Sequence, residues 1–299
     1  MNAFVSLADL RGNAVPLDGR VVNGMSVDVE DWFQVGAFES TIAKTDWDSL
    51  ESRVEANTDA VIELFGKRGV SATFFTLGWV AKRFPALIRR VVEAGHEVAS
   101  HGWDHQRVFT MTPAQFGADL AKTRSILEDA SGSPVTGYRA PSFSIDARTP
   151  WAHEVLAEAG YAYSSSVAPV VHDHYGWPDA PRFAFRPAVG SKMIEIPVTV
   201  ARIGGRSIAT GGGFFRLLPA ALTDFAVRQV NHCDRPAAFY FHPWEIDPGQ
   251  PRVERAPLRS KVRHYSRLRA MAGKLDGLLG RHEWGRMDAV AAREAARFA

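Results

Sequence analysis

Cysteine is almost absent from this chain of 299 residues: Cys233 is the only one, which excludes an internal disulfide and any cysteine-rich zinc site. Long apolar runs are missing as well, because no segment approaches the roughly 20 apolar residues of a membrane-spanning helix. The first residues, 1–12, include Asp9 and Arg11 and no apolar stretch of signal-peptide length. These absences predict a cytoplasmic protein without a transmembrane segment, and they leave peripheral association with the inner membrane open.

The chain also lacks an excess of charge of either sign. It has 35 Lys and Arg against 33 Asp and Glu, and this net charge of +2 gives no indication of a nucleic acid partner. Hydrophobic residues make up 46% of the chain and charged residues 23%, as in ordinary globular proteins. The length suffices for one α/β domain of the barrel type. Oligomeric state does not follow from these numbers.

Short apolar runs alternate with segments of helical periodicity. The pattern predicts strands over residues 21–29, 72–77, 97–100, 135–139, 161–165, 193–200 and 237–241. It predicts helices over residues 53–67, 85–94, 113–129, 151–159 and 219–230. This alternation indicates an α/β fold with a mostly parallel sheet and helices outside it. Residues 169–187 and 204–213 are predicted to be long loops, and the basic tail after residue 258 is predicted to be helical and to pack on the outside.

Two histidines and a cluster of acids have the composition of a catalytic metal site. His101 and His105 follow an apolar run and can converge on one ion if the chain turns helical there. One acid from Asp28, Glu30 and Asp31 can complete a set of two imidazoles and one carboxylate. Such a set leaves positions free for water and substrate, and a second acid remains to act as a base.

The identity of the carboxylate ligand is open between Glu30 and Asp31. If the strand continues past Val29, alternation places Glu30 on the same face as Asp28 and turns Asp31 away. If the chain turns after Val29, Asp31 can bind the metal instead. Alternation slightly favours Glu30.

Polar residues recur at the carboxyl ends of the predicted strands. Asp28, His101, Arg139 and His242 each stand at such an end, which is the face where barrel-like α/β folds carry their chemistry. Each residue also has an ordinary explanation. The histidines can be a surface pair, Asp28 a strand-end cap, Arg139 a structural ion-pair partner and His242 a core imidazole. Their recurrence at one face favours the catalytic interpretation.

The chain resembles the carbohydrate esterase family 4 polysaccharide deacetylases, which have the NodB-homology fold. The resemblance covers roughly residues 21–269 and is carried by four motifs in the family's order, which are Ser26-Val27-Asp28-Val29-Glu30-Asp31, His101 to His105, Tyr138-Arg139-Ala140-Pro141-Ser142-Phe143 and Tyr240-Phe241-His242-Pro243-Trp244-Glu245. Together with the loop Gly211-Gly212-Gly213-Phe214-Phe215-Arg216, these motifs look like the subgroup from exosortase-linked (PEP-CTERM) exopolysaccharide loci.

The resemblance implies a distorted (β/α) barrel over residues 21–258, preceded by an arm at 1–20 and followed by a helical extension at 259–299. It implies metal-dependent removal of N-acetyl groups from amino sugars of an exopolysaccharide or its precursor. The cofactor would be a divalent ion, with Zn²⁺ favoured and Co²⁺, Ni²⁺ and Mn²⁺ as alternatives. The partner would be an N-acetylated oligo- or polysaccharide.

The resemblance also implies roles for single residues. Asp28 would be the general base, His242 the general acid and Arg139 the partner of Asp28. A backbone N–H near Ser142 would bind the oxyanion. Apart from the resemblance, Trp177 and Trp244 are candidates for a rim that stacks on the sugar, although aromatic residues are more often part of a core. The family's fourth motif carries an Asp where this chain has Ser164, Ser165 and Ser166. Glu245 or Asp247 is the candidate replacement.

Two other functions remain open. An amidohydrolase of the allantoinase-like branch would act on a small cyclic amide within the same scaffold. A carbohydrate-binding protein that has lost catalysis would bind the sugar alone. Retention of all five polar residues named for metal binding and catalysis, Asp28, His101, His105, Arg139 and His242, argues against the lapsed form.

Overall fold

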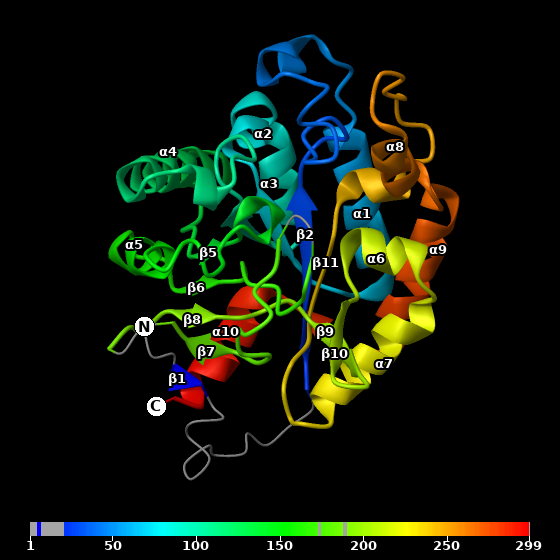
Figure 1. The fold of residues 1–299 in the computed structure, drawn as a ribbon. Coiled ribbons are helices and arrows are strands. Elements are labelled where there is room, and N and C mark those ends of the chain that lie inside the picture. Colours follow the sequence, from blue (N-terminus) through cyan, green and yellow to red (C-terminus); the bar gives the residue numbers. More distant parts are fainter. Residues whose placement is uncertain (1–4, 7–20, 173–174, 188–189, 299) are drawn as a thin grey trace.

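The computed structural model describes residues 5–6, 21–172, 175–187 and 190–298 and contains one large curled sheet (Figure 1). Its strands lie in the order β1 (Val5–Ser6), β7 (Phe185–Arg186), β8 (Ile194–Glu195), β6 (Tyr163–Ser164), β5 (Gly137–Tyr138), β4 (Glu97–Ser100), β3 (Thr73–Thr76), β2 (Asn23–Val29) and β11 (Ala238–Phe241). Neighbours from β8 to β11 are parallel, whereas β7 runs antiparallel to both β8 and β1. The predicted α/β class with a mostly parallel, barrel-like sheet is confirmed.

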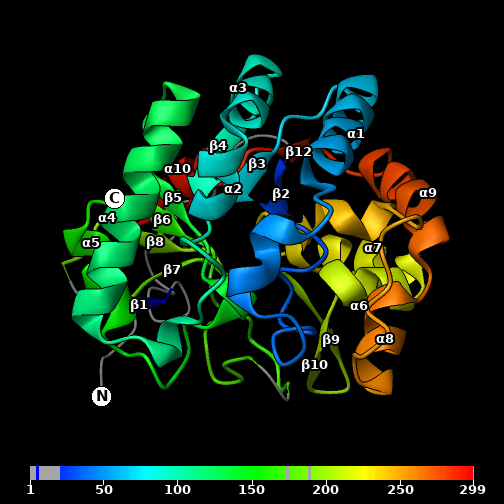
Figure 2. The same cartoon turned by 90° about the horizontal axis from the view of Figure 1, so that it is seen from above.

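Helices connect the parallel strands and cover the outer face of the sheet (Figure 2). These helices are α1 (Val54–Arg68), α2 (Gly78–Arg83), α3 (Pro85–Glu93), α4 (Pro113–Ser131), α5 (Ala152–Glu158) and α7 (Ala220–Asn231). Their ends follow local sequence signals. Thr112 and Gln115 form a capping box at the start of α4, and Gly69, with a φ of 63°, ends α1 in the left-handed conformation. The predicted helix positions are confirmed, whereas α2 was not predicted.

Alternation along the strands separates two hydrophobic cores. Val27 of β2 and Phe74 of β3 point outward and pack with Phe65 of α1 in the larger core. Phe75 of β3 and Ala238 of β11 point to the opposite, concave face and belong to a second core. Since side chains alternate between faces, the concave face of β2 carries residues 24, 26 and 28. The acid of β2 therefore lies inside the curl of the sheet.

The carboxyl-terminal tail is part of the barrel and not only an outer cover, so the prediction that it packs on the outside is wrong in part. It forms α8 (Leu258–Tyr265), α9 (Leu268–Leu279), β12 (Trp284–Gly285) and α10 (Met287–Ala296). β12 pairs in parallel with the start of β2, and Met287 and Val290 of α10 enter the concave core. A Cβ on Gly24 would lie 2.2 Å from the Met287 sulfur, so a larger residue where α10 meets β2 would require the Met287 side chain to move.

The two predicted loops contain regular structure. Segment 169–187 ends in β7, and segment 204–213 contains β10 (Arg206–Ala209) and the start of α6 (Gly212–Leu217). The predicted strand 193–200 divides into β8 and β9 (Val200–Ile203), and β9 forms a hairpin with β10. The 3₁₀ helices are η1 (Lys44–Ser49), η2 (Val108–Thr110), η3 (Pro141–Phe143) and η4 (Pro243–Ile246). Of the predicted arm at 1–20, only Val5–Ser6 lies within the described residues, among which no helix is long and apolar enough to span a membrane.

Candidate active site

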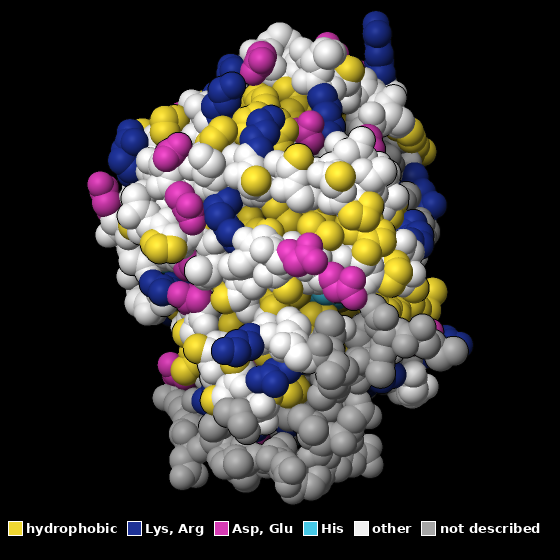
Figure 3. All heavy atoms as spheres, turned by 90° about the vertical axis from the view of Figure 1, so that its left-hand side faces the viewer, with side chains coloured by type: hydrophobic (Ala, Val, Ile, Leu, Met, Phe, Trp, Pro, Cys, Tyr) yellow, Lys and Arg dark blue, Asp and Glu magenta, His cyan; other side chains and the backbone are white. Residues whose placement is uncertain are grey.

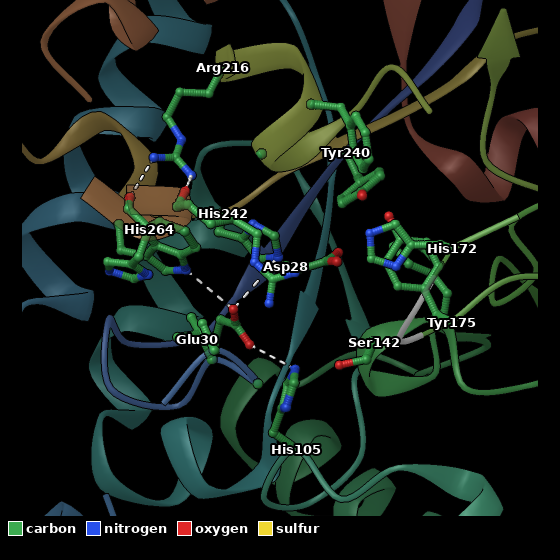
Figure 4. Close-up of a pocket in the computed structure, with 18 of the residues that line it drawn as sticks. Asp28, Glu30, His105, Ser142, His172, Tyr175, Arg216, Tyr240, His242 and His264 are labelled. Carbon is green, nitrogen blue, oxygen red and sulfur yellow. Dashed lines mark hydrogen bonds and ion pairs between the residues drawn. The ribbon is translucent and has the colours of Figure 1, made fainter. Parts of the chain in front are cut away.

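A cavity of about 220 Å³ opens at the carboxyl ends of the central strands (Figure 4). Asp28 and Glu30 reach it from β2 and the turn after it, and His101 from the end of β4. His242 reaches it from the end of β11. All four residues lie on the concave side because they continue the inward alternation of their strands. The structure thus brings together the polar strand ends noted in the sequence.

Arg139 is fully buried beneath the cavity and bonds to Asp28. Its Nη1 donates to Oδ1 of Asp28 and to Oγ of Ser26, both at 2.7 Å. Its Nε and Nη2 donate to the backbone oxygen and the Oγ of Ser165 at 2.9 Å. The guanidinium lies 4.2 Å above the ring of Phe75. These contacts fix the orientation of Asp28, with Oδ1 committed to Arg139.

Glu30, His101 and His105 form a compact set of possible metal ligands. One ligand atom from each lies within 4.8 Å of the other two. Nδ1 of His101 is 2.9 Å from the carbonyl oxygen of Arg139 and donates its proton there, which leaves Nε2 with a free lone pair for a cation. Figure 4 shows Glu30 between His105 and His242.

The two histidines converge without a helix. Residues 101–105 form a bend in which Gly102 has a φ of 74° and His105 a φ of 61°. Convergence of the two imidazoles therefore does not require the helical turn considered in the sequence analysis. The left-handed backbone at His105 is uncommon for a side chain with a Cβ, and such conformations concentrate at functional sites.

The donor set fits a divalent cation chemically. Burial disfavours the charged form of Glu30, but the attraction of His105 and His242 outweighs it and lowers the pKa of Glu30 to about 2. Burial lowers the pKa of His101 to about 4, so its imidazole is neutral near pH 7. Oε2 of Glu30 lies 3.0 Å from Nε2 of His105 but has no hydrogen bond of good geometry. A carboxylate and neutral imidazoles are suitable ligands for Zn²⁺ and similar ions.

Asp31 points away from this set and organises the start of α1. Its carboxylate accepts hydrogen bonds from the Ser52 hydroxyl at 2.6 Å and from the backbone N–H groups of Arg53 and Val54. The Asp31 carboxylate therefore accepts hydrogen bonds at the amino end of α1, where the backbone N–H groups have no acceptor within the helix. The alternative in which Asp31 is the carboxylate ligand does not agree with this arrangement, because Glu30 lies with His101 and His105 and Asp31 does not.

Glu245 is the carboxylate that orients His242. Nδ1 of His242 lies 3.1 Å from Oε2 of Glu245, and the backbone N–H of His242 donates to the same oxygen. Burial lowers the pKa of His242, but Glu30 and Glu245 outweigh this and raise the pKa to about 9. Asp247, the other candidate, instead pairs with Arg53. Where the family's fourth motif has an Asp, Ser165 bonds to Arg139.

The two tryptophans singled out in the sequence have different positions. Trp244 is buried in the cavity wall, and its Nε1 donates to Oε1 of Glu30 at 3.2 Å. Its ring stacks on His264 with centroids 4.1 Å apart and faces His242 at 5.3 Å. Trp177 packs against the main hydrophobic core and does not line the cavity, so its predicted contact with sugar is not supported. Its ring is partly buried against the outside of that core.

Ser142 lines the cavity in a left-handed conformation, with a φ of 52°, and Phe143 beside it also has a positive φ. This turn follows the short strand β5 and brings the residue after Pro141 to the cavity opposite His242. The position is compatible with the predicted oxyanion role of the backbone near Ser142.

Sequence reasoning missed three residues of the site. Tyr240 lines the cavity from β11, one inward position before His242. Arg216 is buried and donates from Nε to Glu245 at 3.1 Å, and its Nη1 also bonds to the backbone oxygen of His264. His264 belongs to α8 of the tail and lines the cavity. The inward alternation of β11 could have identified Tyr240, but no pattern in the sequence indicates that the tail reaches the site.

Known proteins resemble the chain in two adjoining parts. A family described as polysaccharide deacetylase matches residues 42–164, and one described as a domain of unknown function (DUF3473) matches residues 165–292. The chain is 32% identical over 113 residues to a peptidoglycan deacetylase of Helicobacter pylori, which is 38% of either chain. It is 33% identical over 84 residues to a peptidoglycan-N-acetylglucosamine deacetylase of Listeria monocytogenes, which covers 28% of this chain and 18% of the relative. The chain thus spans well under half the length of these relatives.

Solved structures share the fold. A candidate polysaccharide deacetylase from Mycobacterium smegmatis superposes with a TM-score of 0.60 at 18% identity, covering 95% of both chains. The Bc1960 peptidoglycan N-acetylglucosamine deacetylase superposes with a TM-score of 0.51 at 14% identity, also covering 95% of both chains. The metal-ligand candidates His101 and His105 lie in the first matched part, and His242 and Glu245 in the second. Residues 42–164 thus match the polysaccharide deacetylase family, and residues within the DUF3473 match, such as His242 and His264, complete the cavity.

Proposed function

We propose that the chain is a metal-dependent hydrolase that removes N-acetyl groups from amino sugars of a polysaccharide. The observation that carries this proposal is the cluster of Glu30, His101 and His105 in the same cavity as Asp28 and His242. The names of the Helicobacter and Listeria relatives, both deacetylases acting on peptidoglycan or its N-acetylglucosamine, support the same substrate class. The finer context proposed is a bacterial exopolysaccharide or its precursor, which follows from the motif resemblance.

Asp28 is proposed as the general base. Its Oδ1 is held by Arg139, which leaves Oδ2 to accept the proton of the attacking water. Because Arg139 is itself fixed by Ser26 and Ser165, the carboxylate cannot rotate without breaking buried hydrogen bonds. The role of Arg139 in this scheme is to position the base.

His242 is proposed as the general acid. Glu245 holds Nδ1, so Nε2 faces the cavity, 3.6 Å from Oε1 of Glu30. Burial lowers the pKa of His242 but Glu30 and Glu245 raise it, and Glu245 keeps this effect when Glu30 binds a cation, which favours the protonated imidazole. Nε2 can therefore give a proton to the leaving amine as the amide C–N bond breaks.

Glu30, His101 and His105 would hold a divalent cation, which when bound polarises the acetamide carbonyl and lowers the pKa of water. Zn²⁺ is favoured, and Co²⁺, Ni²⁺ and Mn²⁺ share the same ligand preferences. Trp244 supports this set by donating to Glu30 from within the wall. The turn at Ser142 would direct a backbone N–H to the oxyanion.

Acetate release from N-acetylated amino-sugar oligosaccharides tests the proposal. Wild type is compared with Asp28→Asn and His101→Ala, with and without a chelator, and a small cyclic amide is included as a second substrate. Release is expected from wild type only, to stop with chelator and to return with added metal. Turnover of the cyclic amide alone would favour the amidohydrolase alternative, and full activity of Asp28→Asn would refute its role as base.

A further inference from the structure

The segment 252–269, which contains α8, has a charge unlike that of the rest of the chain. It carries seven Lys and Arg and one acid, Glu254, which is a net charge of +6. Since the whole chain has a net charge of +2, the remaining residues together carry −4. The basic character of the protein is therefore concentrated in this one segment.

Apolar side chains are exposed within the same segment. Leu258 is 73% exposed and Val262 57% exposed, although both are large aliphatic residues. They lie four residues apart on α8 and so share one face of the helix. The opposite side of α8 is anchored, because His264 is buried against Trp244. α8 thus exposes Leu258 and Val262 on one side while its other side is fixed to the protein.

This face borders the opening of the cavity. Arg263 and His264, at the end of α8, both line the cavity, so Val262 lies directly beside its rim. Val171, which is 85% exposed, precedes His172 on the other wall. Exposed apolar residues therefore flank the cavity on two sides.

Charged side chains are distributed differently on another face of the molecule. Figure 3 shows the left-hand side of the view in Figure 1, where acidic and basic side chains are interspersed. α8 lies at the upper right of the view in Figure 1, above α6. Mixed charge is typical of a solvated surface, whereas a concentrated positive charge with exposed aliphatic residues is typical of a helix that lies on an anionic bilayer.

We propose that α8 and its flanking residues 252–269 bind the surface of a bilayer that contains anionic lipids. Leu258 and Val262 enter the boundary between headgroups and acyl chains, and Arg255 and Lys261 contact the lipid phosphates. This surface turns the opening of the cavity toward the membrane. A substrate attached to a lipid would then be presented to the site without leaving the bilayer surface.

Sedimentation of the full chain with vesicles tests this binding. One set of vesicles contains phosphatidylglycerol and phosphatidylcholine, and the other contains phosphatidylcholine alone. Two double variants, Leu258→Ser with Val262→Ser and Arg255→Gln with Lys261→Gln, are compared with wild type. The matched controls are Phe225→Ser, which removes an exposed apolar side chain from α7, and Lys82→Gln, which removes an exposed cation from α2.

Wild type is expected to bind the anionic vesicles and to release them as salt is raised. Each double variant should lose about tenfold or more of its partitioning, while the controls keep theirs. All variants should retain the wild-type melting temperature and wild-type turnover of a soluble oligosaccharide, which separates this proposal from the catalytic one. Absence of vesicle binding, equal binding to both vesicle sets, or binding that neither double variant weakens would overturn it.

Discussion

Oε2 of Glu245 lies 3.1 Å from Nδ1 of His242 and also accepts the backbone N–H of the same residue. His242 is the N-cap residue of the 3₁₀ helix η4 and Glu245 is the third residue of that helix, so the pair forms a capping box that holds the imidazole in one orientation. Arg216 bonds to the other oxygen of Glu245. A carboxylate from the DUF3473 part of the chain thus orients the proposed general acid.

Replacing Glu245 by Gln should lower kcat about 10- to 100-fold with little change in KM, since the side chain acts through His242. Glu245 raises the pKa of His242, so its loss lowers that pKa, and the alkaline limb of the pH–rate profile should move to lower pH. A cation bound at Glu30 moves the limb of both proteins downward, which leaves the difference between them measurable. Asp247→Asn is the control, because Asp247 pairs with Arg53, and an unchanged profile in Glu245→Gln would contradict this assignment.

The neighbouring acids Glu30 and Asp31 should separate metal binding from stability. Glu30→Gln is expected to lose bound metal on dialysis while keeping its fold. Asp31→Asn is expected to keep its metal and to lose about 1–2 kcal/mol of unfolding free energy, because its carboxylate binds the start of α1. Metal content by elemental analysis and melting curves check both. Loss of metal from Asp31→Asn alone would reverse the assignment.

Glycine at position 211 is predicted to set the position of Tyr240. A Cβ on Gly211 would lie 2.5 Å from the Tyr240 ring, which real contacts do not allow. Gly211→Ala should displace this ring from the cavity wall and lower kcat/KM at least about tenfold, as small displacements in a site do. A Cβ on Gly213 meets its nearest neighbour, Nη2 of Arg216, at 3.6 Å, so Gly213→Ala should cost far less. Equal losses in the two variants would show that the close approach has no role.

Buried His96 should make the free energy of unfolding decrease at acid pH, independently of the proposed active site. Burial, with a smaller contribution from Arg286, lowers its pKa from 6.5 to about 4. The folded state therefore binds fewer protons than the unfolded state between these values, and stability falls as pH falls from about 6.5 to 4, by at most about 3 kcal/mol. Urea unfolding at several pH values should show this slope, and it should be reduced in His96→Phe.

His96→Phe has a cost of its own, because Nδ1 of His96 accepts the backbone N–H of Ala72. The variant should lose about 1 kcal/mol at pH 7 from the unpaired N–H group. The ring stays packed with Phe74, whose centroid lies 4.9 Å away. If His96→Phe shows the same dependence of unfolding free energy on pH as wild type, groups other than His96 cause the acid sensitivity.

The strand ends of the site could be predicted from sequence because they depend on local patterns. Val29 is apolar between Asp28 and Glu30, and alternation slightly favoured both acids on one face over a ligand role for Asp31; in the structure Asp28 and Glu30 both line the cavity. The positions of the strands and helices around them follow from hydrophobic periodicity and from glycine and proline signals. Local sequence patterns were sufficient to predict these elements and the polar residues at their ends.

The rest depended on contacts between distant segments. Arg216 and His264 are 48 residues apart, and no periodicity connects them. The bend that brings His105 toward His101 depends on a left-handed backbone at Gly102 and His105. The spacing of four residues between the histidines suggested a helical turn instead. Trp177 was a candidate for sugar contact because a sequence does not show whether a tryptophan lies in a cavity wall or packs against a core.

The pairing of β12 with β2 means that residues 23–24 find their neighbours at 284–285. Residues 284–285 must therefore leave the ribosome before β2 has all its neighbours in the sheet, and contacts over such sequence separation form slowly. Nascent or prematurely terminated chains would leave the concave side of the sheet open to water, and assembly of the reactive groups is coupled to the completeness of synthesis.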